Sequence, residues 1–536
     1  MRNFKIYLLG VAAMLFSTSC LDKDPTHAIL ADQSITTVEE ANQAVMGIYS
    51  DFMSRYLYSG NLTLLPDIQS DLVYAVNGYS NAYGDIWRWN INPTNADIEA
   101  VYGSLYKVIG DCNFFFEQVA KWENNIVDDD AYEKLEAYKG EVHFARALAY
   151  SELIKCFCKA YDPATAKDEL GVVLVSSYSN PGEMKRASLY DSYQFVLDDL
   201  TKAYDYMEPE EGTTLVASDY YDSPYFNEFT VQALMARVYL YMQDWDNAIK
   251  YSSELIDSKL YLLSSATTVY TNDMSYYDYM WKYDASTETI WKVGFLPTSY
   301  GGKLGQVFLN FDEISYRPDY VPGQAALNTY EGNDLRYVSF FQDMPTGYAH
   351  GLVWPLLVKY YGNIEFVSNY RIYHVNMPKV FRLSEQYLIR AEAYLALGEK
   401  SKAAADINVL RDRANASYCT AADIDIDYIL DERARELLGE ENRWITLNRL
   451  SVNPNATYIS DCHPIQDETT GNTMYDRARK YAFGYENLSG SNQPREWDPV
   501  EKRYISNFHP YNYQYPIPTQ VIQSNTGIEY PQNTGY

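Results

Sequence analysis

The chain has 536 residues, and its 72 acidic side chains outnumber the 43 basic ones, for a formal net charge of −29 at pH 7. A charge of this sign and size repels nucleic acids and anionic lipids, so it argues against both as partners and favours a neutral or cationic ligand. Tyrosine is unusually frequent, with 54 residues beside 9 Trp and 20 Phe; such rings can stack on sugars, but we expect most of them to fill helix interfaces.

The first twenty residues predict an exported lipoprotein precursor. Basic Arg2 and Lys5 precede an apolar run over residues 6–16, which suits a signal peptide and is too short for a membrane-spanning helix. Small residues at 17–19 lead to Cys20, and we expect cleavage before this cysteine and acylation of its thiol, for instance with palmitate. No later stretch approaches the roughly 18 apolar residues that a spanning helix needs. The alternative is an ordinary signal peptide followed by an incidental cysteine.

Helical signals dominate the first half of the mature chain. Thr37 and Glu40 form a capping box at the start of an apolar pattern, and Asn95 can cap another helix. The acidic, turn-rich residues 208–224 predict a surface loop after these helices. The predicted helices cover residues 38–56, 95–122, 131–157 and 189–207.

Two later segments, residues 236–249 and 391–404, resemble each other at an offset of 155 residues. Tyr239 matches Tyr394, and alanines recur at matching positions of both segments. In each, a helix with Ala and Tyr on its packing face ends in a short turn, and a second helix opens on small residues. This pattern is typical of tetratricopeptide helix pairs, in which small residues let the helices approach closely.

Residues 258–380 and the tail from about residue 451 have a different character, rich in Tyr, Asn, Gly and Pro, with strand-like runs such as 289–296. We therefore predict a mostly α fold: a tetratricopeptide-like helix-turn-helix scaffold that carries long irregular and short-strand insertions, where binding sites commonly lie. The predicted organisation is a signal peptide (1–19), a lipidated tether (20–36) and one folded unit (37–536), with scaffold at about 37–257 and 381–450, ligand-binding insertions at about 70–93 and 258–380, and an irregular C-terminal segment at 451–536.

The densest aromatic and amide cluster outside the predicted helices covers residues 74–92. Trp87 and Trp89 are two positions apart, so on an extended backbone they would face the same side and form one flat platform for a sugar. The alternative is that one tryptophan fills the hydrophobic core beneath the loop. Polar and aromatic partners for ligand hydroxyls are predicted at Asn77, Asn81, Tyr83, Asp85 and Asn90.

A second candidate lies in residues 270–284, where Tyr277, Tyr279 and Trp281 share one face of an alternating pattern. A third is the segment 316–320 with Arg317. Two other tryptophans are expected to be structural. Trp291 should lie on a strand and fill the hydrophobic core, and Trp245 should pack at the turn of a helix pair.

The sequence offers no convincing catalytic or metal site. It contains no HExxH, GxSxG or phosphate-binding glycine loop, and His143 lies in a predicted helix, where a hydrogen-bonded structural role is expected. The acidic run 423–427 imitates a calcium loop, but Tyr428 and Ala434 stand where that loop needs Gly and Glu. We predict no metal and no cofactor. The cysteines after Cys20 fit neither a disulfide framework nor a zinc site and are expected to be buried thiols: Cys112, Cys156, Cys158, Cys419 and Cys462.

Six segments of the mature chain carry a family resemblance. They are KGEVHFARALAYSELIK (139–155), SLYDSYQFVLDDLTKAY (188–204), FTVQALMARVYLYMQDWDNAIKYSSELI (229–256), FRLSEQYLIRAEAYLALGEKSKAAADINVLRDRA (381–414), DERARELLGEENRW (431–444) and YPQNTGY (530–536). In this order they resemble the SusD/RagB family of outer-membrane nutrient-binding lipoproteins from Bacteroidetes. The departures are Glu441, Thr446 and Thr534, where the family usually has Gly, Asp and Pro.

The resemblance implies a surface-exposed lipoprotein that covers a TonB-dependent, SusC-like transporter and captures a glycan, or less often a peptide. An aromatic residue in the loop before a helix often contributes to the glycan platform of this family, which favours Trp87 and Trp89. The acidic residues Asp22 and Asp24 are similar to an export signal of such surface lipoproteins, although an incidental acidic start explains them equally well.

Two other functional classes stay open at this point. Tetratricopeptide arrays commonly bind peptides, so a peptide-uptake lipoprotein or a pure interaction scaffold is the first alternative. A glycoside hydrolase is the second, because 72 acidic residues supply pairs of carboxylates by chance. No pair stands out, so we expect a binding protein that is not an enzyme.

Overall fold

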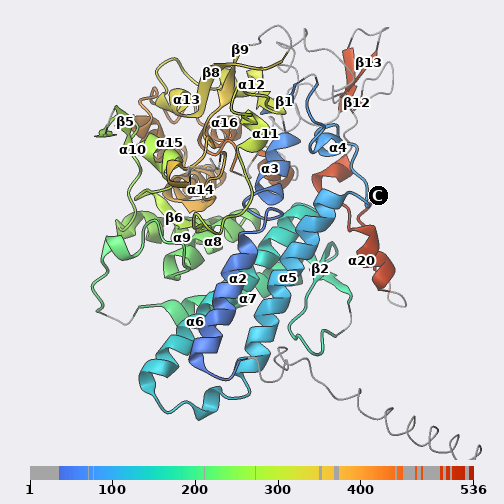
Figure 1. Cartoon of the computed structure of the whole chain (residues 1–536), viewed down its shortest axis with the longest axis vertical. Coiled ribbons are helices and arrows are strands. Elements are labelled where there is room, and N and C mark those ends of the chain that lie inside the picture. The colour runs from blue at the N-terminus through green and yellow to red at the C-terminus, as the bar shows by residue number, and fades with distance from the viewer. Residues whose placement is uncertain are drawn as a thin grey trace, which may run out of the picture.

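The structure, a computed structural model, is drawn in Figure 1. No helix in the described part of the chain is both long and apolar enough to cross a membrane. The predicted signal peptide, Cys20, Asn77 and Cys462 lie outside the described residues. These are 35–70, 72–76, 78–182, 184–209, 212–271, 273–348, 353–366, 373–440, 443–450, 510–525, 530–536 and four short strands between 465 and 506.

Helices form most of the described fold, and the strands are short. The helices are α2 (Val38–Phe52), α3 (Asn61–Ile68), α4 (Gly84–Trp87), α5 (Ala96–Val119), α6 (Asp129–Phe157), α7 (Leu189–Met207), α8 (Glu228–Tyr241), α9 (Trp245–Ser258), α10 (Tyr276–Lys282), α11 (Gln306–Leu309), α12 (Gln324–Asn328), α13 (Leu335–Phe340), α14 (Leu383–Ala396), α15 (Lys400–Arg413), α16 (Ile426–Glu436), α17 (Arg443–Leu450) and α20 (Thr519–Ser524). The strands are β1 (Val73–Ala75), β2 (Leu170–Val173), β3 (Arg186–Ser188), β4 (Val269–Thr271), β5 (Met274–Ser275), β6 (Thr289–Lys292), β7 (Tyr320–Pro322), β8 (Phe341–Pro345), β9 (Val353–Leu357), β10 (Lys379–Arg382), β11 (Ile465–Gln466), β12 (Thr473–Met474), β13 (Arg495–Asp498) and β14 (Arg503–Ser506).

The four helices predicted in the first half are present. The Asn95 side chain caps α5 as predicted, because its Oδ1 accepts the backbone N–H groups of Asp97 and Ile98 at 3.0 and 3.1 Å. Helix α7 has the predicted limits. Helix α2 ends at Phe52, earlier than predicted, because the chain turns back sharply before α3. A Cβ atom on Gly60, in this turn, would meet a backbone oxygen at 1.9 Å, so only glycine fits there.

The predicted repeat is also present, as the helix pairs α8–α9 and α14–α15. Both pairs turn with the same geometry at matching positions. Gln243 and Gly398 are both left-handed, with φ of 60° and 79°. The next N–H, on Asp244 in one pair and Glu399 in the other, donates to a tyrosine carbonyl five residues earlier, at 2.9 and 2.8 Å. This is the Schellman C-cap, and its recurrence confirms the tetratricopeptide-like scaffold.

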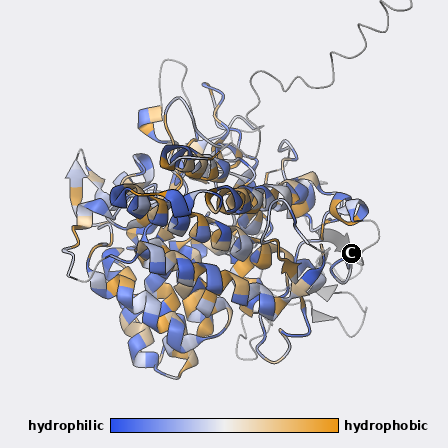
Figure 2. Ribbon diagram, turned by 90° about the horizontal axis from the view of Figure 1, so that it is seen from below, coloured by the Kyte–Doolittle hydropathy of each residue, from blue (hydrophilic) through white to orange (hydrophobic). Residues whose placement is uncertain are grey.

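The helices pack in layers around one large core (Figure 1). Helix α6 lies between α5 and α7, while α9 packs against both α8 and α14 and so joins the two repeat pairs. Seen from below in Figure 2, the helices carry both apolar and polar residues along their length, as amphipathic helices with one buried face do.

Side chains that the sequence predicts to be structural are structural. His143 is buried, and its Nδ1 lies 2.8 Å from Asp199 Oδ1. Trp291 is buried in the main core, and Trp245 packs against the core between the repeat pairs. The cysteines within the described residues are buried thiols: Cys112, Cys156, Cys158 and Cys419.

The two predicted insertions, 70–93 and 258–380, meet at one side of the scaffold. Strand β1 of the first pairs with β7 of the second, antiparallel, with Val73 opposite Pro322 and Ala75 opposite Tyr320. Further two-stranded pairs are β6 with β10 and β8 with β9. A second hydrophobic core lies under these short elements, separate from the core of the long helices. Segments remote in sequence are thus held together at one end of the fold.

Candidate ligand-binding surface

The tryptophan platform predicted in residues 74–92 is not formed. Residues 84–87 make a helical turn, α4, so Trp87 and Trp89 do not share the face that an extended backbone would give them. Trp87 is completely buried and packs edge-on against Tyr79 and Tyr320, with ring centroids 6.3 and 6.5 Å away. Trp89 is half-buried against two core clusters. The core-filling alternative is therefore right for Trp87, which exposes no surface to a ligand.

Tyr83 also faces the scaffold. Its hydroxyl donates to Asn61 Oδ1 on α3 at 2.9 Å, and burial raises its pKa to about 12, with a smaller contribution from Asp97. The backbone of Tyr83 is left-handed, with φ of 54°, and it starts α4. Tyr83 therefore fastens the loop to the scaffold, and its hydroxyl is already engaged.

The groups that this loop does expose are polar and centre on Arg88. The guanidinium donates to the Tyr79 hydroxyl and to Asn81 Oδ1, both at 2.8 Å, and pairs with Asp85 at 3.2 Å. Asn81 is exposed, and the side chains of Arg88 and Asp85 are 22% and 51% exposed. The result is an amide, a carboxylate and a guanidinium fixed side by side at the surface.

The polar cluster packs directly against the backbone of Gly84. A Cβ atom at Gly84 would lie 2.1 Å from Asn81 Oδ1, 2.7 Å from the Tyr79 hydroxyl and 2.8 Å from Arg88 Nη2. All three atoms pack directly against the backbone, so any larger residue would displace them. The glycine allows the cluster to close.

The third predicted candidate, residues 316–320, lies directly beside this loop. The backbone N–H of Ser80 donates to Asp319 Oδ1 at 2.7 Å, and that of Val76 to the Asp319 carbonyl at 2.9 Å. Burial raises the pKa of the Asp319 carboxyl. Arg317, two residues away, is 54% exposed and lies 3.5 Å from Asp312. Two candidates that the sequence could only treat separately therefore form one surface.

An aromatic cluster continues this surface, and of its members sequence reasoning singled out only Tyr316. Phe311 packs on Tyr316 at 4.7 Å and on Tyr373 at 5.3 Å, and the hydroxyls of Tyr316 and Tyr361 are 3.0 Å apart. Tyr361 is 40% exposed. We call the combined surface the loop face; it consists of Asn81, Asp85, Arg88, Phe311, Tyr316, Arg317, Tyr361 and Tyr373.

His374 holds the aromatic cluster together from below. Its Nε2 accepts the Phe311 N–H, and its Nδ1 donates to the Tyr361 carbonyl, both at 3.1 Å. The two bonds fix the neutral imidazole in the Nδ1–H form. Burial lowers the pKa of His374 to about 4, so the imidazole is neutral at physiological pH and joins two loops remote in sequence.

The alternating face predicted for Tyr277, Tyr279 and Trp281 is wrong, because these residues lie on helix α10. A capping box starts that helix: Ser275 Oγ accepts the Asp278 N–H at 3.0 Å, and Asp278 accepts the Ser275 N–H at 3.2 Å. On a helix, Tyr277 and Trp281 share one face, and both are buried. Tyr279 points the other way and is half-exposed.

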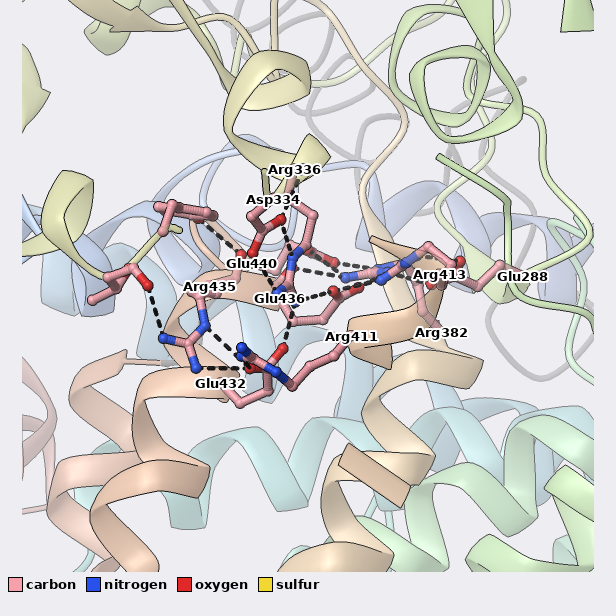
Figure 3. Close-up of polar contacts among 12 residues, drawn as sticks. Glu288, Asp334, Arg336, Arg382, Arg411, Arg413, Glu432, Arg435, Glu436 and Glu440 are labelled. Atoms are coloured by element: carbon pink, nitrogen blue, oxygen red, sulfur yellow. Dashed lines mark hydrogen bonds and ion pairs between the residues drawn. The ribbon is translucent and has the colours of Figure 1, made fainter. Parts of the chain in front are cut away.

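Tyr277 and Trp281 contact a buried network of ion pairs. Arg413 lies over the Tyr277 ring at 4.3 Å, and Lys359 over the Trp281 ring at 4.1 Å. The network draws carboxylates and guanidiniums from α13, β10, α15 and α16 and from residues just before β6, just before α13 and shortly after α16, and Figure 3 shows them converging between these elements. Its members include the partly buried Glu440 and the buried Glu288, Asp334, Arg336, Arg382, Arg411, Arg413, Glu432, Arg435 and Glu436.

Arginines depress the pKa of the central carboxyls. The pKa of Glu432 is lowered chiefly by Arg336, against the opposing effect of burial, and that of Glu436 chiefly by Arg413. Both carboxylates are completely buried and matched by guanidiniums. They support the insertions on the scaffold and have no exposed surface at which to meet a substrate.

A groove of about 500 Å³ lies elsewhere, between α2 and the segment that follows β6. Its lining is mostly apolar and includes Met46, Tyr225, Phe295 and Leu296, with an ion pair between Lys292 and Asp222 at 2.8 Å. Across the part of the chain that the structure describes, no group of three or more His, Cys, Asp or Glu side chains is placed to hold a metal ion.

Comparison with known proteins agrees with the fold. A protein-family model described as "SusD family" matches residues 352–536. A second family model, described as "Starch-binding associating with outer membrane", matches residues 21–240. SusD-like protein P25 of Formosa agariphila is 21% identical over 577 aligned residues, which cover 98% of this chain and 97% of the relative.

Solved structures share the whole architecture. A SusD superfamily protein from Bacteroides thetaiotaomicron aligns with a TM-score of 0.71 and 21% identity, over 93% of this chain and 99% of that one. Surface glycan-binding protein A from Bacteroides fluxus aligns with a TM-score of 0.66 and 19% identity, over 94% of this chain and 100% of that one. With family models matching both halves, a full-length relative and a shared fold, the chain belongs to the SusD/RagB family.

Proposed function

We propose that this protein is a lipoprotein of the outer-membrane surface that binds an oligo- or polysaccharide at the loop face and delivers it to a TonB-dependent, SusC-like transporter. The observation that carries the proposal is the Arg88 cluster beside the Tyr316 aromatic cluster. Guanidinium, amide and carboxylate groups suit the hydroxyls of a sugar, and exposed aromatic rings suit its apolar faces.

The charges of the loop face favour a neutral glycan. Arg88 is paired with Asp85, and Arg317 lies near Asp312, so the cations of the surface are balanced by carboxylates. The chain as a whole carries a formal charge of −29, which repels a polyanionic ligand. Surface glycan-binding protein A from Bacteroides fluxus, which shares the fold, is named for binding a glycan.

Isothermal titration calorimetry against neutral polysaccharides (starch, laminarin, xylan and galactomannan) tests the proposal. We expect one of them to bind the mature protein and Arg88→Ala to weaken that binding about tenfold, as expected for losing a charged hydrogen-bonding partner. Lys107→Ala is the control, because Lys107 is also an exposed cation paired with carboxylates, on α5. Equal binding by wild type and Arg88→Ala would contradict the assignment of the loop face.

The anchor is proposed at Cys20, with residues 20–36 joining it to α2. Metabolic labelling with a palmitate analogue should label the wild-type protein in the outer-membrane fraction, while Cys20→Ala should remain unlabelled. Labelling of the alanine variant would place the lipid elsewhere.

The transporter partnership rests on membership of the family. Purification of the full-length lipoprotein from outer membranes in mild detergent should bring a TonB-dependent transporter with it. Recovery of the lipoprotein alone after chemical crosslinking of intact cells would contradict the partnership.

The protein is proposed to bind without catalysis. Incubation with each polysaccharide that binds should release no reducing sugar. Sustained release by the purified protein, lost in a variant of a loop-face carboxylate such as Asp85→Asn, would establish a glycoside hydrolase instead.

The apolar groove beside α2 favours a second candidate, uptake of a peptide with apolar side chains. Its volume of about 500 Å³ is in the range of small-ligand sites, and Tyr225 and Leu296 at its rim are 53% and 63% exposed. The test is whether the wild type binds a peptide that Leu296→Asp does not bind. That result, together with no binding of any glycan, would establish peptide uptake as the function.

A further inference from the structure

Four tyrosines that the proposed loop face does not include gather where β4 and β5 meet α10. Tyr270 packs on Tyr279 at 4.3 Å and on Tyr276 at 5.0 Å, and Tyr279 stacks on Tyr283 at 4.6 Å with an interplanar angle of 19°. Tyr270 and Tyr276 are 46% and 44% exposed. We call this group the tyrosine patch: Tyr270, Tyr276, Tyr279 and Tyr283.

The local fold holds the patch rigid. Tyr279 on α10 and Tyr283, the C-cap of that helix, are four residues apart, so their rings lie on the same side. Strand β4 pairs with β5, with Val269 opposite Ser275, and this pairing brings Tyr270 against Tyr279. Because the exposed rings are held by their neighbours, little side-chain entropy remains to be lost when a ligand binds.

The patch is continuous with the loop face through residues 361–365. Asn363 Nδ2 donates to the Tyr283 carbonyl at 3.0 Å, which fastens this segment to the end of α10. Two residues before it, the Tyr361 hydroxyl lies 3.0 Å from that of Tyr316 in the loop face. Ile364, between the two regions, is 56% exposed. A chain lying on Tyr316 and Tyr361 can therefore continue over residues 361–365 to the tyrosines.

We infer that the tyrosine patch is a second contact region for the same ligand, reached only by a long, neutral polysaccharide chain. The inference rests on the proposed function of the loop face. Exposed tyrosines offer ring surface and hydroxyls to sugars of any sequence. Two contact regions on one rigid surface raise the affinity of a chain that spans both, and leave the affinity of a short oligosaccharide unchanged.

Calorimetry with a series of oligosaccharides, from disaccharide to decasaccharide, tests the inference. The series are malto-, laminari-, xylo- and mannooligosaccharides. In the wild type, affinity should rise when the chain becomes long enough to reach the patch. The double variant Tyr270→Ala/Tyr276→Ala should bind the decasaccharide about tenfold more weakly and the short members equally. Tyr132→Ala, an exposed tyrosine on α6 at 48% exposure, should match the wild type throughout.

Hydroxyl-radical footprinting of the wild-type protein supplies a test that needs no variant. A bound decasaccharide should protect Tyr270 and Tyr276 from oxidation, whereas a bound trisaccharide should protect only loop-face residues such as Tyr316. Unaltered affinities in the double variant, or equal oxidation of Tyr270 with and without decasaccharide, would overturn this inference alone. Failure of the wild type to bind any member of the four series would overturn the proposed function with it.

Discussion

The Nζ atom of Lys359 lies 4.1 Å from the ring centroid of Trp281, and both side chains are buried. Lys379 and Arg382 approach the same ring, at 4.9 and 5.3 Å. A desolvated cation gains more from an aromatic face than an exposed one does. Trp281 thus stabilises a cluster of buried cations, and its role is structural.

Replacing Trp281 with leucine should therefore cost stability and leave the binding surface intact. We expect the free energy of unfolding to fall by about 3–5 kcal/mol, because a large buried ring and its cation contacts are lost together. Urea unfolding monitored by circular dichroism measures the change. Tyr132→Leu, at an exposed site, should change stability by less than about 0.5 kcal/mol. Wild-type stability in Trp281→Leu would show that the ring is dispensable.

Glu436 should be the most sensitive carboxylate of the buried network. It contacts Arg336, Arg382 and Arg413, so Glu436→Gln leaves three guanidiniums short of a negative charge. Breaking a buried ion pair in this way costs about 3–5 kcal/mol. The matched control is Glu399→Gln, which breaks an exposed pair with Lys402 and should cost less than about 1 kcal/mol in the same assay. Equal effects of the two changes would contradict the structural role of the network.

His374 should make stability fall in mild acid. Its pKa is about 4 in the folded protein and about 6.5 in an unfolded chain. Between these values the unfolded state binds more protons, so the stabilisation is complete above about pH 6.5 and is lost as the pH falls towards 4, by about 3 kcal/mol. From neutral pH to about pH 4, the unfolding free energy of the wild type should fall by about 3 kcal/mol more than that of His374→Gln. Parallel profiles would show that His374 is not responsible.

Gly84→Ala separates binding from folding. The added methyl group would meet Asn81 Oδ1, Arg88 Nη2 and the hydroxyl of the buried Tyr79. The two surface side chains can move aside and Tyr79 less easily, so we expect a stability loss of about 1–3 kcal/mol, which leaves the protein folded. The displaced cluster should bind polysaccharide about tenfold more weakly in calorimetry. Gly103→Ala, on α5 with no atom within 4 Å of the added methyl, should keep wild-type binding. Full binding by Gly84→Ala would show that the cluster geometry is unimportant.

The sequence predicts the scaffold well because its signals are local. Asn95 caps its helix through neighbouring N–H groups, and Gly398 marks the repeat turn through its own backbone conformation. The short helices are harder to predict from the sequence. Alternating aromatics in 276–282 favour a strand, and only the capping pair Ser275 and Asp278 indicates the helix that forms.

The loop face could not be predicted, since it depends on contacts between distant segments. Ser80 reaches Asp319 across 239 positions of sequence, and no local pattern of either segment specifies that meeting. Of the predicted ligand residues, Trp87, Tyr277 and Trp281 are buried. A ligand-contacting role for Asn81 stays a prediction, as it does for Tyr279 within the tyrosine patch.

The shared carboxylates of the buried network have a consequence for how this protein can change through inheritance. Glu288 pairs with two arginines, and Glu432 and Glu436 with three each. A mutation that removes one of these carboxylates leaves several buried arginines without a counter-charge. Such a mutation should therefore persist in evolution only together with compensating substitutions. The charged residues of the network should therefore be conserved together, while loops such as 78–92 accumulate substitutions one at a time. Specificity for a different ligand could then evolve through substitutions in the loops, while the scaffold and its buried network stay unchanged.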